Sequence, residues 1–153
     1  MAVDVTTRIT IARPRREVAD FAADPDRAPA WYSNLKWVEW RTEPPLRVGS
    51  QVAFVADFLG RRLSHTYEVT EFAPGERVVM RTAEGPFPME TSYAWEPTPD
   101  GGTRMTLRNR GEPRGFSRLA APFLSLAMRR ANTKDLALLK AILEHRAGRG
   151  RLL

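Results

Sequence analysis

The chain has 153 residues and a net charge of +6, and 42% of its residues are hydrophobic and 27% charged, a balance that predicts one globular domain with a real core. It has no cysteine, which excludes disulfides, thiolate metal sites and a cysteine nucleophile and fits a cytoplasmic location. The basic residues are scattered without a nucleic-acid motif, and no apolar run approaches the ~20 residues that span a bilayer. We therefore expect neither nucleic-acid binding nor a transmembrane segment.

The first part of the chain predicts a strand, a pair of short helices and a second extended segment. Alternation and β-branched residues indicate a strand over residues 3–11. An apolar stripe at helical spacing then predicts a helix that contains Val18, Phe21 and Ala22. Asp24-Pro25 ends this helix and can cap a second one, which runs to about Tyr32. Extended structure begins again near residue 35.

Three of the four tryptophans lie within the stretch WYSNLKWVEW, residues 31–40. Trp37 and Trp40 have opposite parity, so a regular strand would point them to opposite faces. We expect one of them to pack inward and the other to cover the outer face. Trp31 lies at the end of the helix pair and is expected to fill one end of the curved sheet. Whether it contacts a ligand is left open.

The rest of the chain predicts an antiparallel meander and a long helix. Strands are expected near residues 50–59, 62–72, 77–83, 88–96 and 103–111. Their short turns are typical of antiparallel neighbours. A helical pattern follows from Phe116 to about Arg146, with Pro122 at its start or at a kink. This helix must cover one face of the sheet, which makes the fold class α+β. Residues 1–147 are expected to form a single domain, and residues 148–153 a frayed tail.

Turn chemistry predicts which side chains face inward. Gly60-Arg61, taken as a type II′ turn, places His65 opposite Ala56 and Tyr67 opposite Phe54, and it leaves one face of the hairpin apolar. The later turns predict the inward pairs Val69–Met80, Trp95–Met105, Tyr93–Leu107 and Thr91–Asn109. The polar groups on this face are His65, Tyr67, Thr82, Thr91, Tyr93 and Asn109. Apolar walls with sparse polar groups are typical of small-molecule pockets, whereas a filled core would give each polar group a protein partner.

Two segments are candidates for the entrance to such a pocket. Residues 84–91 form either a mouth loop with Phe87 and Met89 at its rim or an ordinary connector stiffened by two prolines. At the start of the long helix, an apolar stripe belongs either to the core or to the pocket, and it contains Phe116, Leu119, Phe123 and Leu126.

Several segments occur in an order and spacing that resemble one known superfamily. They are ITIARPRREVADFAADPDRAPAW, RVGSQV, EVTEFAPGERVVMRT, DGGTRMTL and KDLALLKAILE, which together cover about residues 3–144. The chain resembles the START-like helix-grip superfamily (SRPBCC), in its polyketide cyclase/dehydrase-type branch. The resemblance implies a curved antiparallel sheet of about seven strands that wraps around the long C-terminal helix, with two short helices after the first strand and a cavity between sheet and helix. It also implies small hydrophobic ligands, but it does not settle catalysis, because function varies on one fold.

His65 and Tyr67 are the candidate catalytic pair. A histidine and a tyrosine that project into an apolar cavity could transfer protons on a polyketide carbonyl. They could equally hold a ligand by hydrogen bonds, or His65 could be a core histidine with a protein partner. Asp57 points outward, so no carboxylate is expected to orient the histidine. One inward histidine is too few for a metal site, and we expect neither a metal nor another cofactor.

These observations lead to three functional hypotheses. The first is a protein that binds a small hydrophobic molecule, such as a lipid, a polyketide or an aromatic compound, between the sheet and the C-terminal helix. The second is a polyketide cyclase, aromatase or dehydratase that uses His65 and Tyr67 as acid and base. The third is an interaction module that binds an acidic partner, and the formation of a homodimer is left open. Ligand contacts are expected from Trp31, Phe54, Phe58, His65, Tyr67, Met80, Met89, Tyr93, Trp95, Asn109 and Phe123.

Overall fold

A computed structural model describes residues 3–58, 60–84, 88–112 and 120–152, with side chains except those of Phe58 and residues 147–152. The elements are β1 (Val3–Ile11), α1 (Arg15–Ala22), the 3-10 helix η1 (Pro25–Arg27), α2 (Ala28–Trp31), β2 (Leu35–Trp40), β3 (Gln51–Phe58), β4 (Arg61–Ala73), β5 (Arg77–Glu84), β6 (Met89–Pro97), β7 (Thr103–Gly111) and α3 (Ala121–Leu152). The predicted order of elements is therefore confirmed.

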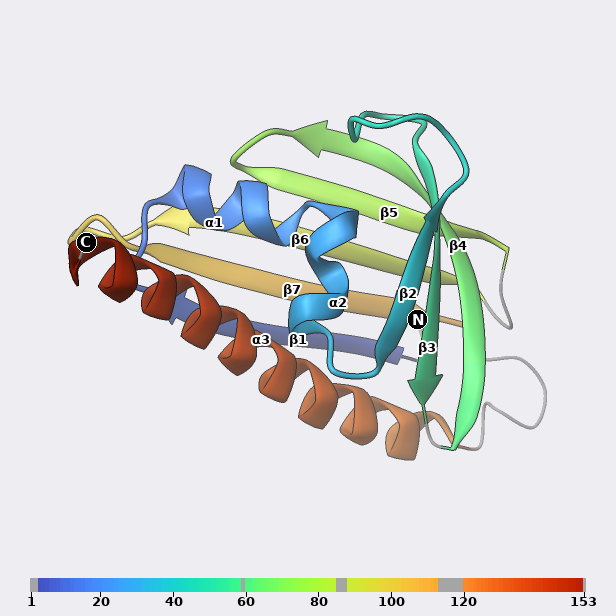
Figure 1. Ribbon diagram of the computed structural model, residues 1–153. Helices are drawn as coiled ribbons and strands as arrows, with labels where there is room; N and C mark the ends of the chain where they lie inside the picture. Colours follow the sequence, from blue (N-terminus) through green and yellow to red (C-terminus); the bar gives the residue numbers. More distant parts are fainter. Residues whose placement is uncertain (1–2, 59, 85–87, 113–119, 153) are drawn as a thin grey trace.

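The strands form one 7-stranded sheet in the order β1-β7-β6-β5-β4-β3-β2, and each neighbouring pair is antiparallel. Figure 1 shows the sheet curving around α3, which runs along β1, while α1 and α2 lie on the same side of the sheet. This confirms the α+β class and the curved antiparallel sheet wrapped around a long C-terminal helix. Within the described part of the chain, no helix is both long enough and apolar enough to cross a membrane.

The register of the β3–β4 hairpin differs from the prediction. Phe54 pairs with His65 and Phe58 with Arg61, so Arg61 belongs to β4 and the turn is not centred on Gly60-Arg61. Gly60 adopts φ +77, the left-handed conformation that glycine takes at no steric cost. Because the pairing moves by an even number of residues, every side chain keeps its predicted face. His65 therefore lies opposite Phe54 rather than the small Ala56.

The other predicted pairings are confirmed. They are Val69–Met80 between β4 and β5, and Trp95–Met105, Tyr93–Leu107 and Thr91–Asn109 between β6 and β7. These pairs direct large apolar side chains from four neighbouring strands toward α3, and Val69, Met80, Tyr93 and Trp95 all belong to the main core. The sheet therefore presents one continuous inner face to the helix.

α3 begins at Ala121, so Pro122 lies in its first turn, where no intrahelical N–H is required of it. Two side chains about three helical turns apart tie the helix to β1. Arg129 Nη1 donates to the Thr6 carbonyl at 3.2 Å, and Lys140 Nζ donates to the Thr10 carbonyl at 2.7 Å. These contacts advance in the same direction along both elements, so the helix and β1 run side by side. α3 also includes the backbone of residues 148–152.

The prediction that Phe123 faces the interior is wrong. Its side chain is 71% exposed, and Leu126 is 48% exposed. The inward positions in this part of α3 are Ala121, Leu124 and Met128, which pack with β1. Ala121, Leu124 and Met128 form the stripe that docks on β1. Phe123 and Leu126 lie outside that stripe. Phe116 and Leu119 lie outside the described residues.

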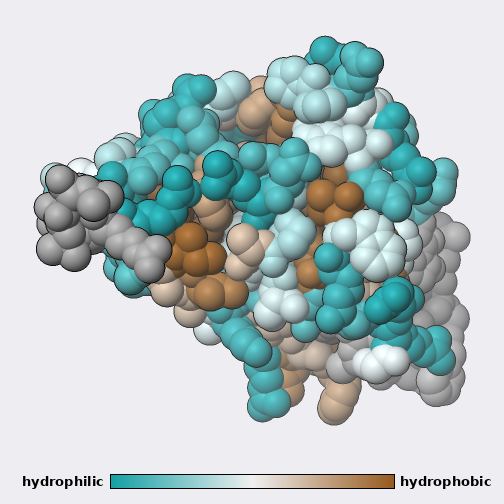
Figure 2. All heavy atoms as spheres, in the orientation of Figure 1, coloured by the Kyte–Doolittle hydropathy of each residue, from teal (hydrophilic) through white to brown (hydrophobic). Residues whose placement is uncertain are grey.

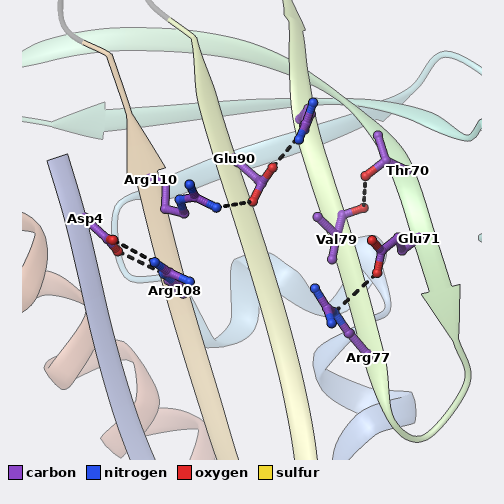
Figure 3. Close-up of polar contacts among 9 residues, drawn as sticks. Asp4, Thr70, Glu71, Arg77, Val79, Glu90, Arg108 and Arg110 are labelled. Atoms are coloured by element: carbon purple, nitrogen blue, oxygen red, sulfur yellow. Dashed lines mark hydrogen bonds and ion pairs between the residues drawn. The ribbon is translucent and has the colours of Figure 1, made fainter. Parts of the chain in front are cut away.

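The outer face of the sheet carries arginines that are paired with carboxylates across neighbouring strands (Figure 3). Arg108 makes a two-point contact with Asp4, with N–O distances of 2.9 and 2.7 Å. Glu90 accepts from Arg81 at 2.8 Å and lies 3.5 Å from Arg110. Exposed ion pairs contribute little stability each, and Arg81 and Arg110 share the single carboxylate of Glu90, so the pairs offset part of the positive charge. These pairs give no support to the hypothesis of a basic surface for an acidic partner.

Candidate functional site

The interior between the sheet and α3 contains two separate hydrophobic clusters. The larger cluster lies toward the C-terminal half of α3, and its buried members include Ile11, Trp31, Trp95, Met105, Leu107, Leu136, Leu139 and Leu143. The smaller cluster lies toward the start of α3 and consists of Val3, Val5 and Ala121, with Leu124 and Met128 packed against them. On the face that carries the helices, Figure 2 shows apolar residues in gaps between polar side chains.

Polar side chains also lie on the inner faces of the sheet and of α3. We call Thr7, Tyr67, Thr91, Asn109 and Asn132 the polar belt. On β1, Thr7 lies between Val5 of the smaller cluster and Ile11 of the larger one, and on α3, Asn132 lies between Met128 and Leu136 in the same way. The exposed fractions of Thr7, Thr91, Asn109 and Asn132 are only 9%, 7%, 8% and 6%. The belt therefore has members on both the sheet and the helix.

Part of the polar belt is internally bonded. Thr91 Oγ1 donates to Asn109 Oδ1 at 3.0 Å, between directly paired positions of β6 and β7. Burial raises the pKa of Tyr67, and a hydrogen bond with Thr91 acts in the opposite direction. Tyr67 therefore stays protonated near neutral pH. Tyr67, Thr91 and Asn109 therefore form a linked group on β4, β6 and β7.

Tyr32, which follows α2, is paired with Tyr93 of β6. The hydroxyls of Tyr32 and Tyr93 are 2.6 Å apart, and the ring of Trp31 stacks on Tyr32 with 4.0 Å between centroids. Burial raises the pKa of both Tyr32 and Tyr93, so neither ionises near neutral pH. Together with Tyr67, these are all 3 tyrosines of the chain, and all lie on the inner side of the fold.

Asp135 is a buried carboxyl group on α3, one turn after Asn132, with an exposed fraction of 3%. Its Oδ1 accepts hydrogen bonds from the Ser33 backbone N–H at 3.1 Å and from the Ser33 hydroxyl at 2.9 Å. Burial raises the pKa of Asp135, while the two hydrogen bonds from Ser33 oppose that change. The residue ties α3 to the segment that follows α2.

Five buried side-chain atoms that can donate lack a partner among the described residues. Arg110 Nε lies on the outer side of the sheet, and the other four, on the inner side, are Thr7 Oγ1, Trp31 Nε1, Trp95 Nε1 and Asn132 Nδ2. Buried polar groups in folded proteins are nearly always hydrogen-bonded, so each such group calls for an explanation. Two of these inner atoms, on Thr7 and Asn132, belong to the polar belt, and the other two, on Trp31 and Trp95, belong to the larger cluster.

His65 is half-buried at the end of this inner face, and its ring centroid lies 6.0 Å from that of Tyr67. Burial lowers its pKa below the ordinary 6.5, because the charged imidazolium is poorly solvated there. The imidazole is therefore neutral at pH 7 and has the protonation state of a general base.

The structure brings most of the predicted ligand-binding residues to the inner side. Buried there are Trp31, Met80, Met89, Tyr93, Trp95 and Asn109, and half-buried are Phe54, His65 and Tyr67. The side chain of Phe58 lies outside the described residues, and Phe123 is exposed, as corrected above. Direct contact of these residues with a ligand stays a prediction.

Sequence reasoning missed Tyr32, Asn132 and Asp135. A signal for two of them was present, because Asn132 and Asp135 fall at helical spacing on the same stripe as Leu136 and Leu139. Polar residues on an otherwise apolar stripe of a helix point into the core and need a partner there. In the described part of the chain, no three histidine, aspartate or glutamate side chains gather as metal ligands would.

The sequence matches the family model described as polyketide cyclase/dehydrase and lipid transport over residues 2–144. No curated protein matches the chain in sequence. A START superfamily protein from Mycobacterium smegmatis superposes with a TM-score of 0.80 at 14% identity, covering 93% of this chain and 97% of that one. The protein TTHA0849 from Thermus thermophilus gives 0.78 at 20% identity over 90% and 94% of the two chains. The Zhui aromatase/cyclase from Streptomyces sp. R1128 gives 0.76 at 19%, covering 94% of each chain. At these identities the likeness concerns the fold alone.

Proposed function

The chain belongs to the polyketide cyclase/dehydrase and lipid transport family, and from this premise we propose that it binds a small hydrophobic molecule between the sheet and α3. A lipid, a polyketide or an aromatic compound would suit the site. The observation that carries the proposal is that Thr7 and Asn132, which lie between the two apolar clusters on β1 and α3, each bury a polar atom without a partner among the described residues.

Most polar groups of the inner face have protein partners, as in a filled core, but the unpartnered atoms of Thr7 and Asn132 support binding. A core built only for stability gains nothing from burying Thr7 and Asn132 without protein partners, because each desolvated polar group costs free energy. A ligand site has the opposite composition, with mostly apolar walls and a few polar groups that orient the guest. The two clusters would hold apolar parts of the molecule, and the belt would hold its polar group.

Native mass spectrometry after mild purification tests the proposal. We expect a fraction of the protein to carry an added mass of a few hundred daltons, which solvent extraction releases as a hydrophobic compound. The control is the same protein after solvent extraction and refolding, which should regain the mass of the bare chain. A protein that carries no added mass and takes up no hydrophobic probe in solution would contradict the proposal.

Acid–base catalysis on a polyketide is the second candidate function, and the neutral imidazole of His65 beside Tyr67 favours it. If His65 is the base, its replacement by alanine should lower kcat on a linear poly-β-ketone by about 100-fold or more. Because the pKa of His65 lies below its ordinary 6.5, activity should persist at pH 6.5 and fall only at more acidic pH.

The chain offers a matched control for this experiment. His145 is the other histidine, is exposed, and lies near the end of α3, so His145→Ala should leave kcat unchanged. Tyr67→Phe tests the partner without removing the ring. Unchanged turnover in both His65→Ala and Tyr67→Phe would exclude this mechanism and leave the binding function standing.

A further inference from the structure

We infer, on the basis of the proposed function, that the bound molecule is uncharged and carries an oxygen that accepts hydrogen bonds, such as a ketone or ester carbonyl, at the polar belt. The interior therefore selects among hydrophobic molecules by the chemistry of one polar group.

The first support is that the unsatisfied groups of the interior are donors. Trp31 Nε1, Trp95 Nε1 and Asn132 Nδ2 are N–H donors, and Thr7 Oγ1 is a hydroxyl that can donate. None of these atoms has a partner within the described residues. A guest that supplies an acceptor oxygen would satisfy such donors, whereas a hydrocarbon would leave them desolvated and unpaired.

Asn132 is the best placed of these donors. It stands on the inner stripe of α3, one turn after Met128 of the smaller cluster and one turn before Leu136 of the larger one. Because Arg129 bonds to the Thr6 carbonyl, this turn of α3 lies beside the middle of β1, where Thr7 points inward. The amide of Asn132 and the hydroxyl of Thr7 therefore approach the same part of the interior from the helix and from the sheet.

The second support is the sign of the buried charge. Among the described residues, Asp135 is the one buried carboxyl group, and no described lysine or arginine is buried. His65 is half-buried and neutral at pH 7, because burial lowers its pKa. A carboxylate guest would lose its hydration, find no cation, and lie near Asp135, which follows Asn132 by one helical turn. A neutral carbonyl avoids both costs.

Three aromatic probes of nearly equal shape separate these possibilities: 2-acetylnaphthalene, 2-isopropylnaphthalene and 2-naphthoate. Their dissociation constants can be measured by equilibrium dialysis at pH 7. We expect the ketone to bind about fivefold to tenfold more tightly than the hydrocarbon, which corresponds to the net gain of one ordinary hydrogen bond. The carboxylate should bind about tenfold or more weakly than the hydrocarbon.

Substitutions show which residues cause the differences in affinity among the three probes. In Asn132→Leu, the advantage of the ketone over the hydrocarbon should fall to about twofold or less, while retained binding of the hydrocarbon shows that the fold is intact. Thr133→Val is the matched control, since the exposed Thr133 hydroxyl bonds to its own helix at Arg129, and all three affinities should stay unchanged. In Asp135→Asn, the affinity for 2-naphthoate should rise about fivefold or more, while the ketone changes by less than about twofold.

The outcomes are distinguishable. A hydrocarbon that binds as tightly as the ketone, or a carboxylate that binds most tightly of the three, overturns the inference and leaves the proposed function intact. An Asn132→Leu variant that keeps the full preference for the ketone also overturns it. If none of the three probes binds and no hydrophobic compound co-purifies, the proposed function fails and the inference fails with it.

Discussion

Replacement of Trp31 by alanine is expected to lower the free energy of unfolding by about 3–5 kcal/mol, which urea denaturation followed by near-UV circular dichroism can measure. The side chain has 0% exposure. Its ring stacks on Tyr32 and lies 6.0 Å from Tyr93, centroid to centroid, so it joins α2 to the sheet. Truncation removes this contact area and leaves a cavity that the stiff neighbouring rings cannot fill.

Trp37 provides the matched control for Trp31. It is 42% exposed, its Nε1 donates to Glu39 Oε1 at 3.2 Å, and the guanidinium of Arg62 lies 5.6 Å from the ring centroid. Cation–π contacts at exposed sites contribute about 0.5–1 kcal/mol, so Trp37→Ala should cost about 1 kcal/mol or less. Equal losses in the two variants would contradict the assignment of Trp31 to the core.

The three tryptophans of residues 31–40 thus have three different environments. Trp31 is in the core. Trp37 is exposed, which agrees with the expectation that one of Trp37 and Trp40 faces outward. Trp40 is half-buried, and its Nε1 donates to Asp26 of η1 at 2.9 Å. The sequence could predict that Trp37 and Trp40 diverge, because strand parity is a local property. It could not predict the bond to Asp26, because that contact depends on how η1 packs against β2.

The sequence was enough to predict which strand side chains face inward, but not the register of the β3–β4 hairpin. Gly60 can supply a positive φ at more than one position of a two-residue turn, so turn chemistry alone did not choose between the predicted register and the observed one. Both choices keep the same parity, which is why His65 and Tyr67 were placed on the correct face although their partners were wrong. Parity is robust because an even slip leaves the apolar face intact.

The helix side of the site was harder to predict than the sheet side. Phe123 belongs to an apolar stripe in the sequence, but the docked face of α3 depends on where the helix begins and on which side chains β1 offers. Asn132 and Asp135 lie on the true inner stripe, and their roles appear only when Ser33, Thr7 and the two clusters are placed around them. Sequence periodicity identifies a buried helix face, whereas partners across the interior require the tertiary arrangement.

Replacement of Leu139 by alanine is expected to lower the free energy of unfolding by about 2–5 kcal/mol, measured as for Trp31. Leu139 has 0% exposure and faces the larger cluster from α3. The leucines that join α3 to this cluster all lie on the C-terminal side of Asn132. Truncation at Leu139 therefore weakens the principal apolar contact between the helix and the sheet, and the smaller cluster at the start of α3 cannot replace that area.

Leu138, the preceding residue, is the control for Leu139. It is the same residue type at a neighbouring position of the helix, but its side chain is on a different face. It is 39% exposed, so Leu138→Ala should cost about 0.5 kcal/mol or less. A loss of equal size in the two variants would mean that α3 does not dock through the stripe that carries Asn132. In that case Asn132 would not face the interior, and the hydrogen-bonding preference inferred for the guest would lose its structural basis.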